Sequence, residues 1–481
     1  MAEDFRAEIS ALVEQRKQEY TDMSDRIWEF AEPRFQEYDS SALQQEYLRS
    51  RGFSIRADLA GEKTAFIAEF GSGKPVLAFL GEFDALSSLE QEADQTERRP
   101  IKGKTNGHGC GHHLLGTASV AAVDALKSYM EAHSLPGTIR YYGCPAEENA
   151  GGKAYLVRDG YFSDCDAAIT WHPSTTNKTM MADKFLANFR VFFTFHGISS
   201  HAAGAPELGR SALDAVEIMD IGVNYMREHM IDAARVHGAI TNPGGIAPNV
   251  IPSEAQILYA IRAPKVTQVQ KLFERMCDIA KGAALITGTT VDIKQVAAYS
   301  NVIENDTLEE IMDENMRHFI PIGYTEEELA YAKRFQQVIT ELDKEGLKDM
   351  ISVIGGRDKE KKQEMLETPM LDLVLDRKLT FGGGGSTDVG DVSWVCPTSQ
   401  IVAATCAGGT PEHTWQMVSQ GKSSIAHKGL LYAGKVLAAA AIDLLEDPEL
   451  VKKAAEEFER KTGPDGYQPL LPREAKPWMK K

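Results

Sequence analysis

The residues best suited to chemistry lie in the stretch "NGHGCGHHLLGTAS", residues 106–119, where His108, Cys110, His112 and His113 stand among glycines. Cys110 and His112 are two residues apart, so an extended or turning backbone points both side chains to the same side. Such a pair can bind a metal ion. Two alternatives stay open at this point, a glycine-rich turn into a helix and a thiol nucleophile beside histidines.

Three more segments carry residues of the same chemical kind. "PAEENAGG" places Glu147 and Glu148 side by side, "TWHPS" contains His172, and "GGTPEHTWQ" contains His413. One carboxylate of an adjacent pair can bind a metal ion while the other takes up and returns a proton. One cysteine, one glutamate and three histidines suit Zn(II) or Mn(II). A single member could be merely structural, but the set predicts a metal site.

The elements that must position these residues follow an alternating pattern. Residues 65–80 predict two strands around a Gly-Ser-Gly turn, and the second runs into "GEFDAL" with Asp84. A helix over 114–132, a strand over 137–148 and a helix over 151–162 come next. We therefore expect an α/β domain with a largely parallel sheet. Ligands bind beyond the carboxyl ends of such strands, where Asp84, the glutamate pair and His172 fall.

The pattern changes after residue 173 to an alternating strand, a long helix and another strand. We interpret residues 188–296 as an inserted α+β domain, which divides the catalytic domain into 1–187 and 297–481. Residues 304–370 are charged and helical in pattern, and we expect a helical insertion there.

The composition limits the classes of function. With 43% apolar and 25% charged residues among 481, the chain is typical of globular proteins. A net charge of -18 opposes binding to nucleic acid or an anionic membrane, so an acidic substrate requires a locally cationic cleft. We expect no membrane span and no signal peptide. Without a signal peptide we expect a cytoplasmic protein, and the six scattered cysteines are not expected to form a disulfide framework.

Over most of its length the sequence resembles the dinuclear-metal amidohydrolases and exopeptidases, which include aminoacylase, glutamate carboxypeptidase and the auxin-conjugate amidohydrolases. The motifs "GHGCGHHLLGTA", "APNVIPSEAQILYAIRAP", "STDVGDVSW" and "GTPEHTWQMVSQGKSSIAHKG" are similar to those of the branch that acts on p-aminobenzoyl-glutamate. The resemblance implies hydrolysis of an N-acyl amino acid, with p-aminobenzoyl-glutamate as the leading substrate. A general aminoacylase or dipeptidase and a non-catalytic metal-binding partner subunit are the alternatives.

The resemblance also implies roles for individual residues at two divalent ions, Mn(II) or Zn(II). Cys110 matches the bridging ligand, Glu147 the general base and Asp84 the acid that orients a ligand, while the terminal ligands are His112, Glu148, His172 and His413. Two departures are Glu82, where the wider family often has a ligating histidine, and His113, where the cysteine-containing branch often has an aspartate. A purely structural zinc site would need no spare carboxylate beside its ligands.

The inserted domain resembles the lid and dimerisation domain of the family. That match implies that His201 stabilises the oxyanion in the site of a partner subunit, and that Asn249 and Arg262 bind the free carboxylate of the substrate. Arginine suits this task because its planar fork meets a carboxylate in a bidentate way. The partner is expected to be a second copy of the chain or a related subunit.

Overall fold

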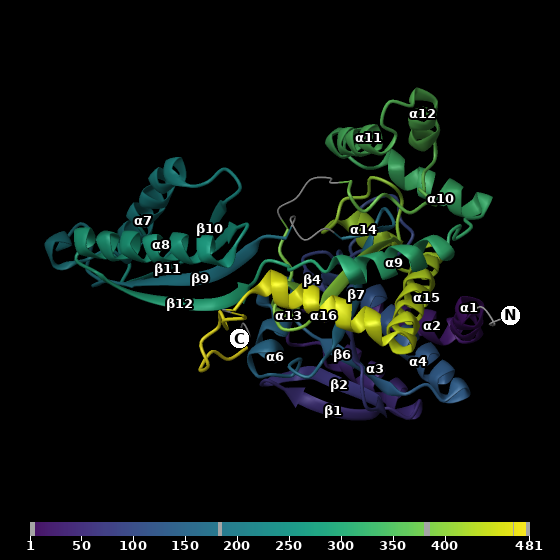
Figure 1. The fold of residues 1–481 in the computed structure, drawn as a ribbon. Coiled ribbons are helices and arrows are strands. Elements are labelled where there is room, and N and C mark those ends of the chain that lie inside the picture. The colour runs from purple at the N-terminus through teal and green to yellow at the C-terminus, as the bar shows by residue number, and fades with distance from the viewer. Residues whose placement is uncertain (1–4, 181–184, 380–384, 465, 478–481) are drawn as a thin grey trace.

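The computed structural model describes residues 5–180, 185–379, 385–464 and 466–477. Its larger unit is built on a seven-stranded sheet with the order β1-β2-β6-β3-β7-β13-β8 (Figure 1). The strands are β1 (Ser54–Leu59), β2 (Glu62–Ser72), β3 (Val76–Glu82), β6 (Gly137–Cys144), β7 (Ala167–Ser174), β8 (Lys178–Thr179) and β13 (Thr398–Ala404). The four central strands β6, β3, β7 and β13 are parallel, which confirms the expected fold class. The outer strands pair in an antiparallel way.

Helices cover both faces of this sheet. The apolar helices α4 (His112–His133) and α15 (Ser424–Glu446) pack on one face together with α1 (Phe5–Gln15) and α2 (Lys17–Phe30). The helices α6 (Gly152–Arg158) and α13 (Val389–Ser393) cover the other face. Strand β3 is buried on both sides, with Leu77 and Phe79 in one core and Ala78 and Leu80 in the other. A continuous apolar strand of this kind is typical of the centre of a parallel sheet.

A second unit, here called the lid, is an antiparallel sheet with the order β10-β11-β9-β12, with two helices on one face (Figure 1). Its elements are β9 (Ala187–His196), α7 (Ala212–Met226), β10 (Arg235–Asn242), β11 (Glu254–Ala263), α8 (Val266–Thr287) and β12 (Thr290–Tyr299). Phe189, Val191, Phe193 and Phe195 alternate along β9 into the lid core, so the residues between them face the opposite side.

Four helices fill the segment expected to be helical: α9 (Asp306–His318), α10 (Glu326–Gln337), α11 (Glu341–Ile354) and α12 (Lys359–Glu367). The first packs against α15, whereas α10, α11 and α12 project away from the sheet (Figure 1). The remaining elements are α3 (Tyr38–Ser50), β4 (Leu86–Ser87), β5 (Asn106–Gly107), α5 (Glu147–Ala150), α14 (Trp415–Gln420) and α16 (Pro448–Thr462).

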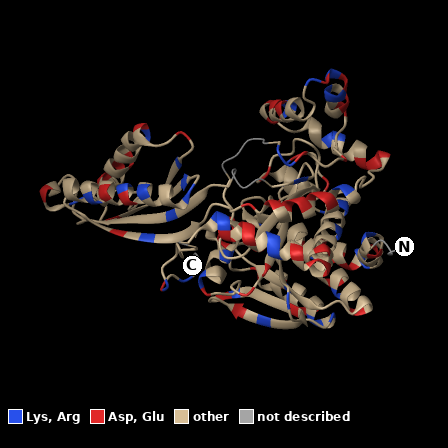
Figure 2. Ribbon diagram, in the orientation of Figure 1, with Lys and Arg blue, Asp and Glu red and all other residues tan. Residues whose placement is uncertain are grey.

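Acidic and basic residues are mixed in the view of the chain that Figure 2 gives. Figure 2 shows Asp and Glu residues interspersed with Lys and Arg along the helices of both units. Among the described residues, no helix is both long and apolar enough for a bilayer crossing.

Candidate metal centre

The predicted ligands come from the carboxyl ends of neighbouring strands and from the start of one helix. Strand β3 leads into Asp84, β6 leads into the glutamate pair, and β7 carries His172 near its end. Cys110 and His112 lie where the glycine-rich turn enters α4. Gly111, the residue before the helix, has φ 77, and a Cβ there would lie 2.9 Å from the side chain of Pro173. Glycine is needed at this position because the backbone is left-handed and β7 passes close by.

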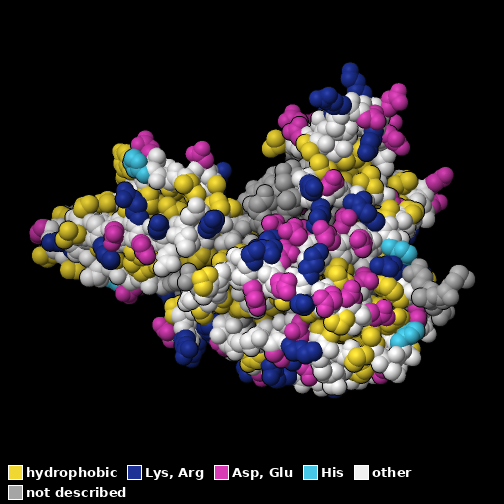
Figure 3. Space-filling view, in the orientation of Figure 1, with side chains coloured by type: hydrophobic (Ala, Val, Ile, Leu, Met, Phe, Trp, Pro, Cys, Tyr) yellow, Lys and Arg dark blue, Asp and Glu magenta, His cyan; other side chains and the backbone are white. Residues whose placement is uncertain are grey.

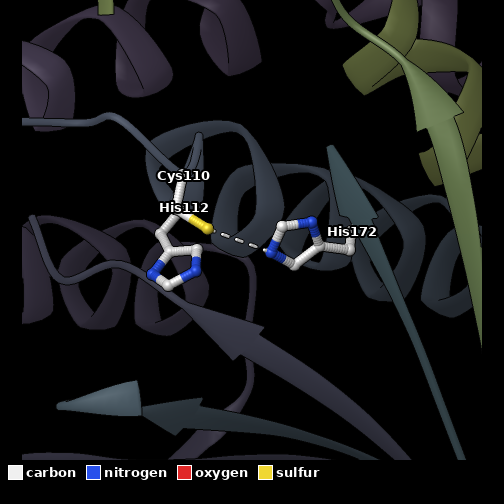
Figure 4. A group of neighbouring side chains, drawn as sticks. All are labelled: Cys110, His112 and His172. Carbon is white, nitrogen blue, oxygen red and sulfur yellow. Dashed lines mark hydrogen bonds between the residues drawn. The ribbon is translucent and has the colours of Figure 1, made fainter. Parts of the chain in front are cut away.

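Three groups of candidate ligand atoms lie close together; two of them share Cys110, and the third is Glu82, His112 and Glu147. The first group is Cys110, His112 and His172, and within each group the candidate atoms lie within 4.8 Å of one another. Cys110 Sγ is 3.3 Å from His172 Nε2, and the side chains converge as Figure 4 shows. The second group is Cys110, Glu148 and His413, with His413 Nε2 3.2 Å from Glu148 Oε1. A sulfur atom common to both groups is the arrangement expected of a bridging ligand.

The orientation of His112 fits a metal ligand. Its Nδ1 donates to Asp84 Oδ1 at 2.9 Å, and its buried Nε2 makes no hydrogen bond among the described residues. Burial opposes a charge on this imidazole, but Asp84 outweighs it and raises the pKa of His112 to about 10. The same Asp84 accepts from the backbone N–H of Glu148 at 2.8 Å. One carboxylate therefore positions two neighbouring candidate ligands, as the outer hydrogen-bond partners of metal sites usually do.

Glu147 and Glu148 differ in their environments although they are adjacent. Burial raises the pKa of Glu147 well above its ordinary value, and the negative charges of Glu82 and Asp388 add to the effect. Burial acts on Glu148 in the same direction, but the close contact with His413 overcomes it and lowers the pKa of Glu148 to about 2. A carboxylate that stays ionised suits a ligand, and one that readily takes a proton suits a general base.

Two residues at the site have a strained backbone conformation. Ala146, directly before Glu147, has φ 60, and His413 has φ 58, although neither is glycine. Residues held in the left-handed region cost free energy and persist where the surroundings fix them, often at functional sites. The backbone N–H of Ala146 donates to the buried Glu37 Oε1 at 3.0 Å, which helps to hold the turn.

A buried lysine beside the site was not predicted from the sequence. Lys153 Nζ donates to Glu82 Oε1 at 2.5 Å and to Asp388 Oδ1 at 2.6 Å, with all three side chains shielded from solvent. Glu82 Oε2 in turn lies 3.2 Å from His112 Nε2. Glu82, at the position where the wider family often has a histidine, is thus the counter-ion of Lys153.

A cavity of about 370 Å³ opens onto these ligands, a volume typical of sites for small molecules. Glu147, Glu148, Cys110, His172 and His413 line it, together with Arg262 from the lid. His201 and Asn249 do not line it; both lie exposed on the lid of the same chain, near the bridge between His201 and Val250. Asn188, Arg190 and Tyr299 line the cavity as well, and no sequence motif had singled them out.

Residues 78–369 match the model of Peptidase family M20/M25/M40. The fold and the donor set agree with that match: the chain belongs to this family and is a metal-dependent amidohydrolase.

Individual relatives extend the match. The chain is 44% identical to one of the subunits of p-aminobenzoyl-glutamate hydrolase from Escherichia coli K12, over 98% of each chain. It is 32% identical to Xaa-Arg dipeptidase of mouse, over 83% of this chain and 79% of that protein. Among solved structures, the YXEP protein of Bacillus subtilis, described as a dinuclear metal binding peptidase from the M20 family, aligns with a TM-score of 0.55. It shares 18% identity and covers 90% of this chain and 99% of its own.

Proposed function

We propose that this enzyme hydrolyses p-aminobenzoyl-glutamate to p-aminobenzoate and glutamate, using two divalent ions, Mn(II) or Zn(II). The observation that carries the reaction is the sharing of Cys110 between two ligand groups, with Glu147 next to ligand Glu148. The substrate is supported by the 44% identity, over nearly the whole chain, to a hydrolase of that compound.

Glu147 is the residue that moves protons. Cys110, His112, Glu148, His172 and His413 would hold two divalent ions, whose positive charge would polarise the amide carbonyl and acidify water. Glu147 takes the proton of the attacking water on its carboxylate and donates it to the departing amine nitrogen. Its raised pKa fits this exchange, because the same group must accept and then release a proton.

The oxyanion is proposed to be stabilised by His201 of the partner subunit. In the structure, Nδ1 of His201 accepts from the backbone N–H groups of Ala203 and Gly204 at 3.2 and 3.1 Å. The proton of the neutral ring is then on Nε2, which is free to act as a donor. A fixed donor aimed at developing negative charge is among the strongest catalytic contributions.

The lid offers an apolar surface for that partner, which we propose to be a second copy of the chain or a related subunit. Exposed apolar side chains gather on its helices, as the space-filling view shows (Figure 3). They include Ile221 and Tyr225 on α7 and Leu285 and Ile286 on α8, each more than half exposed. Such a patch is typical of interaction surfaces.

Mixing two inactive variants tests the shared site. In a dimer of a His201→Ala chain with a Glu147→Gln chain, one site combines an intact Glu147 with an intact His201. Activity should therefore return when the variants are mixed, although each alone is slow. Mixtures that stay as slow as either variant would contradict a histidine supplied by a partner copy.

The proposed location is the cytoplasm. All six cysteines are free thiols in the structure, and unpaired cysteines are typical of reducing compartments.

The first experiment measures p-aminobenzoate released by metal-stripped protein restored with Mn(II) or Zn(II), beside a panel of acetyl, benzoyl and indolyl-acyl amino acids. The proposed substrate is supported if p-aminobenzoate is released only with metal present and the other acyl amino acids are hydrolysed slowly. Faster turnover of another acyl amino acid would replace that substrate and keep the hydrolase reaction.

A further inference from the structure

A row of polar side chains crosses the lid sheet where it meets the cavity. Asn188 on β9 is paired in register with Arg262 on β11 and with Tyr299 on β12. All three line the cavity of the metal centre. Residues paired directly across strands have side chains on the same face, so the row forms one wall of the cavity.

Arg190 extends this wall by one more position on the same face. It lies two residues after Asn188 on β9, and its partners in register are Ala260 on β11 and Ala297 on β12. Two methyl side chains leave the guanidinium room, and Arg190 lines the cavity. Arg262 and Arg190 are diagonal neighbours, which in an antiparallel sheet lie roughly 7–8 Å apart and within reach of long side chains.

The side-chain amide of Asn188, unpaired within the described residues, is evidence that a ligand binds at this wall. The residue has no exposed surface, and neither Oδ1 nor Nδ2 makes a hydrogen bond among the described residues. A buried amide without partners costs roughly 1–3 kcal/mol, so native proteins rarely keep one without a use. Asn188 is adjacent to both arginines, opposite Arg262 and two residues before Arg190, where a bound anion would accept from its N–H group.

The charge of Arg190 also acts on Arg262. Burial lowers the pKa of Arg262, and the charge of Arg190 lowers it further. Burial and Arg190 act in the same way on Arg34. Like charges held together away from water repel, and an anion bound between them relieves that repulsion. A chain of net charge -18 thus carries a cationic wall in this cavity.

We propose that Arg190 and Asn188 bind the side-chain carboxylate of an acidic amino acid whose α-carboxylate is bound by Arg262. The pocket then selects amides of glutamate or aspartate, which deepens the proposed function and rests on it. Arg262 suits the α-carboxylate because it lines the same cavity as Glu147, the residue placed at the scissile amide. An N-acyl arginine would instead place a cation against Arg190.

The test compares p-aminobenzoyl-glutamate with p-aminobenzoyl-glutamine, which has the same shape but a neutral side chain. Arg190→Gln should lower kcat/KM for the glutamate compound by roughly 10–100-fold, mainly through KM, because a charge-assisted hydrogen bond contributes about 1.5–3 kcal/mol. The value for the glutamine compound should change little. Arg275→Gln, an exposed lid arginine on α8 outside the cavity lining, is the matched control and should leave both values unchanged.

Binding is measured separately by calorimetry with Mn(II)-loaded Glu147→Gln protein, so that the outcome does not depend on turnover. A preference for the glutamate compound that disappears when Arg190→Gln is added supports the subsite, even if the wild type hydrolyses neither compound and the proposed function fails. An equal loss for both compounds, an unchanged preference, or no binding of either compound would overturn the inference. Asn188→Ala should weaken the preference in the same direction.

Discussion

Asp84 contacts His112 through one carboxylate oxygen, at 2.9 Å from Nδ1, and uses the other oxygen for the backbone N–H of Glu148. It therefore fixes one ligand in each of the two groups that share Cys110. Asp84, two residues beyond the end of β3, thus positions His112 and Glu148 although it belongs to neither group itself.

The first prediction concerns this double contact. Asp84→Asn keeps the shape but leaves one acceptor oxygen for two donors, so one contact is lost. We expect metal affinity to fall roughly 10–100-fold, the usual effect of losing an outer hydrogen bond to a ligand. Titration of metal-stripped protein with Mn(II) measures it. Asp164→Asn, which changes a surface partner of Arg140, is the control; equal affinity in both variants would refute the role of Asp84.

The second prediction concerns the general base. Glu147→Gln should retain both ions, because Cys110 and its partner ligands are untouched, and should lose turnover by roughly 10²–10⁴-fold, the usual contribution of such a group. Metal content and kcat are measured on the same sample. Glu412→Gln changes another acid that lines the cavity and serves as the control. Full activity with metal retained would rule out this assignment.

Much of this candidate metal centre was predictable because short sequence segments identify the strands and the turn that carry its residues. Apolar runs that end in chemistry-bearing residues identify β3, β6 and β7, and a sheet brings their ends together whatever the loops between them do. "GCGH" is itself a short segment whose glycines permit the turn into α4. Strand β1 was missed because it is an edge strand with mostly exposed side chains and lacks a clear apolar alternation.

Features that depend on distant pairing could not be predicted in the same way. Lys153 in "GGKAYLV" has the appearance of a surface lysine, and its burial follows from partners 71 and 235 residues away in the chain. The alternation of Asn188 and Arg190 with phenylalanine and valine does predict a polar face. Only the register with β11 and β12 places that face beside Arg262 and Tyr299.

The third prediction concerns the buried lysine. Lys153→Met leaves Glu82 and Asp388 without their cation in the protein interior, so the free energy of unfolding should fall by roughly 3–5 kcal/mol. Urea unfolding measures the loss. Lys344→Met removes a partly exposed lysine paired with the exposed Glu341 on α11 and should cost less than about 1 kcal/mol. Similar losses in the two variants would contradict the importance of the buried pairs.

The fourth prediction concerns pH and a carboxyl group on α9, far along the chain from the metal ligands. Glu309 is 6% exposed, and burial, with the charges of Glu304 and Asp306, raises its pKa from 4.5 to about 8. The folded chain therefore binds a proton that the unfolded chain releases between these values. The resulting stability is complete below pH 4.5 and is lost as the pH rises through about 8.

Glu309→Gln removes this linkage because glutamine does not titrate. The variant should gain stability relative to the wild type as the pH rises, by at most about 4 kcal/mol between about pH 5 and pH 8, since each of the three pH units corresponds to about 1.4 kcal/mol at most. Urea unfolding at the two pH values measures the difference. Glu310→Gln changes the neighbouring exposed acid and should follow the wild type. A difference between Glu309→Gln and the wild type that stays constant with pH would mean that Glu309 is already ionised in the folded chain.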